Sequence, residues 1–182
     1  MRTFLLFALL ASAPISILTQ KNELPSCHYQ GDTFDYGAML TYCSQKIESF
    51  APRLEALQDD SQEMVLEPTN EQERNDMLCA YTSFLKAVFR MRQEIACIDD
   101  ETAHLVASAI WYSMHGVFQL FAAEVQKEAI NEVIDWIKKH ADDTWEPQEN
   151  VDAYKPKSQW AALRKEEADD FSDLLREIEE DL

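Results

Sequence analysis

Long stretches of this chain repeat apolar residues at intervals of three and four positions, which is the period of an amphipathic α-helix. The repeat is clearest near the end, where Ala168, Phe171, Leu175, Ile178 and Leu182 are separated by 3, 4, 3 and 4 positions. Three glycines and six prolines among 182 residues leave few of the turn residues that many short strands need. The sequence therefore predicts an all-α fold.

The first residues have the composition of a secretory signal peptide. Arg2 supplies one early positive charge, and the apolar run over residues 4–18 ends in small side chains. A membrane span needs about 18 or more consecutive apolar residues, whereas this run is shorter and contains Pro14. We predict a signal peptide over residues 1–19, with an uncleaved anchor as the alternative. The mature protein is then extracellular and has no membrane span.

The charge of the chain argues against some partners. It has 16 basic and 34 acidic residues, a formal net charge of −18. Such a surface repels the phosphates of nucleic acids and of anionic membranes, so we expect neither as a partner. Two interpretations of the acidity stay open, namely solubility of an exported protein and attraction for a basic partner or divalent cations.

Capping and breaking residues divide the chain into helical segments. Asn70 followed three residues later by Glu73 is a capping box, and Asp99 and Asp100 give another start. Pro52 kinks or restarts the first helix, because a proline inside a helix loses a backbone hydrogen bond. In chain order, the predicted segments are a helix over about 32–58, a loop over 59–68, a helix over 70–97, a central helical stretch over 101–140, a connector over 142–157 and an acidic amphipathic helix over 158–182.

The central stretch over 101–140 is either one long helix or two helices joined near Glu124. Its first half is apolar on most sides, whereas its second half has a narrower apolar stripe. A helix that is apolar all round is normally buried, so we expect the first half to be buried and the second half to be more exposed. Residues 64–66 in the preceding loop are also apolar, and we expect them to fold back against the helices. Residues 20–141 then form one helical domain.

Four cysteines follow the signal peptide, at Cys27, Cys43, Cys79 and Cys97. An even number in an oxidising compartment implies two disulfides. The midpoints of Cys27–Cys97 and Cys43–Cys79 both fall in the loop between the first two helices, so an antiparallel hairpin would bring both pairs together. We predict these two nested bonds. Zinc is the competing interpretation, but zinc sites usually contain closely spaced cysteine pairs, and the sequence has none.

No motif for catalysis, nucleotide binding or metal binding occurs in the chain. His104 and His115 are eleven residues apart, about 16 Å along one side of a helix, which is too far to share a metal. Acidic pairs such as Asp142 with Asp143 lack the spacing of a calcium loop. We predict a protein without enzymatic activity, metal site or cofactor.

Seven aromatic residues would converge if the hairpin packs on the central helix. They form either a solid core or the lining of a cavity for a lipid or another small apolar ligand, since such sites often lie between the helices of a bundle. The seven residues are Tyr81, Phe84, Phe89, Trp111, Tyr112, Phe118 and Phe121.

The C-terminal helix has an apolar face that needs a surface to cover it. That surface is either the protein's own core or a partner protein. The candidate partner-binding residues are Trp160, Leu163, Phe171, Leu175 and Ile178.

One stretch resembles a known family. The resemblance rests on the helical cysteine spacing, on Cys97, and on the run Leu78, Cys79, Ala80, Tyr81, Thr82, Ser83 and Phe84. Residues 27–121, about half of the chain, are similar in this way to a secreted roundworm family called domain of unknown function nineteen. Its members typically carry more cysteines, and Ala87 stands where another would be expected. The resemblance implies a secreted helical domain and supplies no catalytic residues.

These observations predict a disulfide-braced antiparallel helical hairpin packed on a long third helix, with a C-terminal amphipathic helix docked or tethered. The predicted function is a secreted, non-enzymatic interaction module with an unknown protein partner. The alternative is an extracellular carrier of a small apolar ligand.

Overall fold

The computed structural model describes residues 36–58, 64–141 and 155–182. Within these ranges the protein is helical and has no strand, which confirms the all-α prediction. The elements are α2 (Tyr36–Gln58), α3 (Glu71–Ala96), α4 (Glu101–Phe118), α5 (Ala123–His140), the 3-10 turn η1 (Lys157–Gln159) and α6 (Trp160–Glu180). The predicted signal peptide, Cys27 and most of the predicted connector lie outside the described residues.

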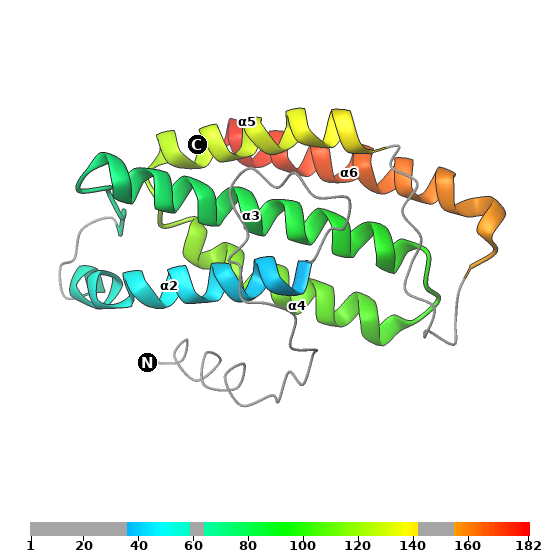
Figure 1. The fold of residues 1–182 in the computed structure, drawn as a ribbon, viewed down its shortest axis with the longest axis horizontal. Helices are drawn as coiled ribbons and strands as arrows, with labels where there is room; N and C mark the ends of the chain where they lie inside the picture. Colours follow the sequence, from blue (N-terminus) through cyan, green and yellow to red (C-terminus); the bar gives the residue numbers. More distant parts are fainter. Residues whose placement is uncertain (1–35, 59–63, 142–154) are drawn as a thin grey trace.

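Helix α3 is the centre of the fold. Figure 1 shows it running between α2 on one side and α5 and α6 on the other, and it contacts each of the other four helices. Because it is surrounded, 18 of its 26 residues are buried. Its start is the predicted cap, since the Glu73 N–H donates to Asn70 Oδ1 at 2.9 Å. The Glu73 carboxylate accepts in turn from the N–H of Thr69 at 2.6 Å, one residue earlier than in a standard capping box.

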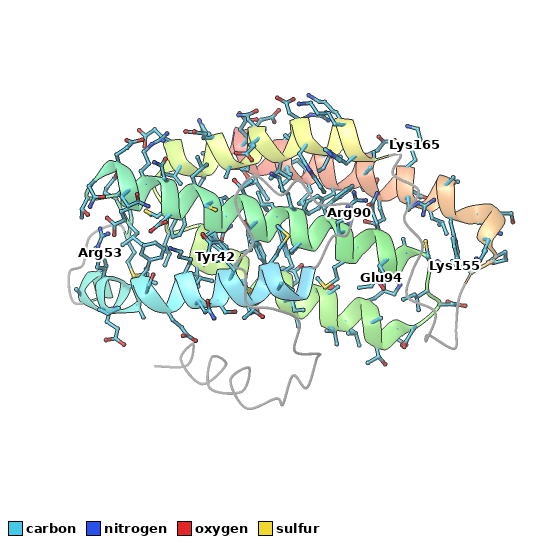
Figure 2. All side chains as sticks on the ribbon, in the orientation of Figure 1. Tyr42, Arg53, Arg90, Glu94, Lys155 and Lys165 are labelled. Carbon is cyan, nitrogen blue, oxygen red and sulfur yellow. The ribbon has the colours of Figure 1, made fainter. Side chains whose placement is uncertain are left out.

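Helices α2 and α3 form the predicted antiparallel hairpin (Figure 1). Pro52 lies inside α2, which continues past it to Gln58. Arg53 follows directly and holds the end of α2 to the start of α3, through an ion pair with Glu73 and a hydrogen bond of 2.6 Å to the carbonyl of Glu67. Figure 2 shows Arg53 at the end of the bundle where the two helices are joined.

The predicted central stretch is two helices, and Leu66 explains where it breaks. The Leu66 N–H donates to the carbonyl of Leu120 at 2.6 Å, and the Ala122 N–H donates to the carbonyl of Leu66 at 3.3 Å. The carbonyl of Leu120 and the N–H of Ala122 therefore pair with Leu66 instead of with a continuous helix, at the point where α4 ends and α5 begins. Leu66 is fully buried, as expected for residues 64–66, whereas Met64 is exposed.

The two halves of this stretch are buried in the reverse of the predicted order. Helix α5 buries its apolar stripe, which includes Ile130 and Val133, because it lies against both α3 and α6. Helix α4 packs mainly on α3, so its opposite side faces solvent. The prediction that the first half is the more buried was wrong, because apolar composition does not reveal how many neighbours a helix has.

Candidate interaction surface

The predicted aromatic cluster is largely a packed core. Tyr81 and Phe84 on α3 each lie 5.0 Å from Phe118 on α4, measured between ring centroids. Phe118 also contacts Phe121, and Trp111 stacks on Phe84. The rings fill the space between α3 and α4 in which a ligand cavity would have to lie.

Phe89 and Tyr112 differ from the other five aromatic residues in their surroundings. Phe89 is buried against α5 and α6, where it contacts Trp136 and Phe171, and Phe171 in turn lies 5.9 Å from Trp111 of the cluster. Tyr112 is on the outer side of α4 and 78% exposed. The structure therefore does not bring all seven residues together.

A buried polar pair lies within the ring cluster. The Tyr81 hydroxyl is 3.1 Å from Nε2 of His115, and the His115 ring stacks on Trp111 at 4.2 Å. Burial lowers the pKa of His115 to about 4, so the imidazole is neutral at physiological pH. This pair could not be inferred from the sequence, because its two residues are 34 positions apart on different helices.

The nested disulfides are not formed. Cys43 and Cys97 are free and buried, while Cys79 belongs to a disulfide whose other half lies outside the described residues. The Cys43 thiol donates to the carbonyl of Ala80 at 3.2 Å, so the hairpin does bring it to the predicted level of α3. The predicted Cys43–Cys79 bond is excluded because Cys79 is bonded to another residue and Cys43 is free. Burial raises the pKa of both free thiols.

The predicted partner face of the C-terminal helix is covered by the protein itself. Helix α6 packs on α3 and α5 and buries Trp160, Phe171 and Leu175, whereas Leu163 and Ile178 are half-buried. The protein's own core therefore covers most of this face, and binding of a partner through these five residues stays a prediction.

Polar contacts from α3 fix how α5 and α6 dock. Lys86, almost fully buried, donates to Glu132 of α5 at 2.9 Å. Arg92 pairs with Glu167 of α6 at 2.8 Å, and the Gln93 amide donates to a backbone carbonyl of α6 at 3.3 Å. Figure 2 shows Arg90 on the same half of α3, and its guanidinium lies 5.2 Å from the ring centroid of Trp136. A buried charge must be paired, so these contacts favour one arrangement of the helices.

A shallow groove of about 560 Å³ lies between α5 and α6. Its three cations each pair with an acid on their own helix: Lys138 with Asp135, Lys165 with Asp169, and Arg176 with Asp173. These exposed pairs leave little net charge to attract a ligand. In the part of the chain that the structure describes, no three metal-binding side chains are grouped together.

Among the described residues, the outer side of α4 exposes several apolar side chains. We call it the α4 outer face, and it comprises Leu105, Val106, Ala109, Tyr112 and Gly116, all of them exposed. Leu105 is 63% exposed and Val106 52%. Large apolar side chains that adjoin one another on a surface, with polar residues around them, are typical of interaction sites.

Charge is absent from this helix beyond its first residue. The run from Thr102 to Phe118 contains no Asp, Glu, Lys or Arg, although 27% of the whole chain is charged. Surface helices of soluble proteins usually place charged residues on the solvent side. The uncharged run is visible in the sequence, but a helix that is apolar on most sides predicts burial and not exposure.

The fold and this surface define a helical bundle with one apolar helix at its edge. No family model, no curated protein and no solved structure matches the chain. The resemblance of residues 27–121 to the roundworm family stays a prediction. No helix among the described residues is both long enough and apolar enough to cross a membrane.

Proposed function

We propose that the protein is a secreted, non-enzymatic interaction module that binds its partner through the α4 outer face. The observation that carries this proposal is the exposure of Leu105, Val106 and Tyr112 on a helix without charges. Tyrosine is enriched among the residues that dominate binding energy, because it offers a large, stiff contact area. The face replaces α6 as the candidate docking surface.

The interaction module is a better interpretation than the apolar-ligand carrier. A carrier needs an enclosed apolar space, whereas Tyr81, Phe84 and Phe118 contact one another where that space was expected. The groove between α5 and α6 is lined largely by charged side chains, which suit an apolar ligand poorly.

Export is supported by the apolar run over residues 4–18 and by the disulfide at Cys79, since disulfides persist in oxidising compartments. We propose Cys27 as the partner of Cys79, because Cys43 and Cys97 are free thiols and the chain has four cysteines. The two free thiols are buried, which protects them from oxidation. Peptide mapping without reduction should recover Cys27 linked to Cys79, and a link from Cys43 to any other cysteine would contradict the proposal.

A binding experiment tests the proposed surface. The tagged protein and its Tyr112→Glu variant are incubated with extracellular fluid from the cells that produce the protein, and bound proteins are identified by mass spectrometry. Met64→Glu is the matched control, because it places the same charge on another exposed apolar side chain that is not part of α4. We expect partners that the wild type and the control retain and that Tyr112→Glu loses. Equal recovery with all three proteins would contradict the proposal.

A further inference from the structure

We propose that the partner of the α4 outer face is a second copy of the same chain, paired through α4 in an antiparallel, two-fold symmetric arrangement. This inference rests on the proposed function and names the occupant of its surface. It is carried by the spacing of large and small residues, by the place of Gly116 and by the distribution of charge.

The spacing on the face is that of a helix–helix seam. Leu105, Ala109, Tyr112 and Gly116 are separated by 4, 3 and 4 positions, which is the spacing of the seam residues in a coiled coil. The larger residues of the seam alternate with the smaller ones. A partner helix that fits this pattern must place small residues opposite Leu105 and Tyr112.

The α4 outer face of a second copy has this complementary pattern when the two α4 helices are antiparallel. In an antiparallel pair centred between Ile110 and Trp111, Leu105 of one copy lies opposite Gly116 of the other. Tyr112 then lies opposite Ala109, so every large residue meets a small one. A parallel pair would place Tyr112 against Tyr112 and Gly116 against Gly116, which is a poorer fit. A two-fold interface requires this self-complementarity.

The second observation is that glycine occupies position 116 although the fold of a single chain does not require it. A Cβ built at this residue would meet no atom within 4 Å, and its backbone is helical, so the fold of a single chain does not require glycine there. Glycine in a helix costs about 0.5–1 kcal/mol relative to alanine. The close approach of Leu105 from a second copy gives a reason for a residue without a side chain.

Charge restricts where a second copy can bind. Two chains that each carry a net charge of −18 repel one another, so they associate most easily through a surface without acidic groups. The run from Thr102 to Phe118 is such a surface. Its flanking acids, Asp99, Asp100 and Glu101, lie at one end of α4, and the antiparallel arrangement separates the two clusters by about the length of the helix, roughly 27 Å.

Sedimentation equilibrium of the purified protein tests the arrangement. We expect the average mass to rise from one chain to two as the concentration increases from about 1 µM to about 1 mM, because a short seam gives a weak interface. Gly116→Leu should weaken association at least about tenfold by blocking Leu105 of the second copy. Adding Leu105→Ala to Gly116→Leu should restore association, since the large and small positions are then exchanged. Met64→Glu should associate like the wild type.

Three results would overturn the inference. The first is a wild type that stays monomeric up to 1 mM, and the second is association that Gly116→Leu leaves unchanged. The third is a double variant that is no better than Gly116→Leu, although circular dichroism shows both to be folded. If the wild type is monomeric while Tyr112→Glu still loses a protein from extracellular fluid, the second copy is excluded and the interaction module stands. If the wild type is monomeric and Tyr112→Glu loses no protein from extracellular fluid, both proposals fail.

Discussion

Helices α4 and α5 are consecutive, each has 18 residues, and yet they relate to the core in opposite ways. Helix α4 has no charged residue after Glu101 and buries four residues, whereas α5 has charged residues on its outer side and buries seven. The difference shows that the number of neighbouring elements decides burial: α5 lies against both α3 and α6, and α4 packs mainly on α3. An apolar helix at the edge of a bundle can therefore be largely exposed, as α4 is.

The largest effect in this comparison is expected in α5. Ile130 is fully buried, so Ile130→Ala should lower the free energy of unfolding by about 2–5 kcal/mol through lost contacts and a cavity. Ile130→Val should cost about 0.5–1.5 kcal/mol as a graded control. Urea denaturation measures both. A loss below 1 kcal/mol for Ile130→Ala would mean that α5 is not embedded in the core.

The second effect concerns the one buried ionisable side chain of α4. The unfolded chain binds a proton at His115 below pH 6.5, whereas the folded protein does so only near pH 4, because burial lowers the pKa. Stability should therefore fall between pH 6.5 and 4, by up to about 3 kcal/mol. The His115→Gln variant has no imidazole at this position. Between pH 6.5 and 4, its free energy of unfolding should therefore fall less than that of the wild type, by up to about 3 kcal/mol. Parallel pH profiles for the two proteins would contradict the buried pair with Tyr81.

A smaller effect of opposite sign is expected at Gly116. In dilute solution, where the protein is monomeric, Gly116→Ala should raise the free energy of unfolding by about 0.5–1 kcal/mol, because alanine is the better helix former and its Cβ has open space. Thermal unfolding at about 1 µM measures it. A destabilised variant would show that the monomer itself needs glycine at this position.

The smallest effect is expected on the α4 outer face. Leu105 is largely in solvent, so Leu105→Ala should change the free energy of unfolding by less than about 0.5 kcal/mol in dilute solution. The contrast with Ile130→Ala sharpens the comparison, since both variants shorten an aliphatic side chain. A loss above 1 kcal/mol on urea denaturation would mean that the face is covered within the monomer.

Features set by neighbouring residues in the sequence were predicted well. The caps at Asn70 and Asp100 form as expected, because a cap joins residues two or three positions apart. The return of Leu66 to the core also followed from its apolar character between polar residues. The hairpin prediction placed Cys43 at the correct level of α3, within one residue of its contact with Ala80.

Features set by the assembly of the helices could not be predicted. Consecutive side chains on a helix point about 100° apart. The level at which Cys43 meets α3 therefore does not decide whether it bonds to Cys79. The pair of Tyr81 and His115 depends on how α4 is rotated against α3. The exposure of Tyr112 depends on the absence of a further helix over α4 among the described residues, and the periodicity of the sequence does not reveal how many helices surround α4.

The most direct test of the account is the accessibility of α4 and α5 in the dilute, folded protein. Tyr112→Cys and Val133→Cys are compared by their rates of labelling with a maleimide, with the wild type as the control for its buried thiols. The account predicts that Tyr112→Cys reacts about as fast as a free cysteine and that Val133→Cys is protected until the protein unfolds. Protection at position 112, or fast labelling at position 133, would contradict it.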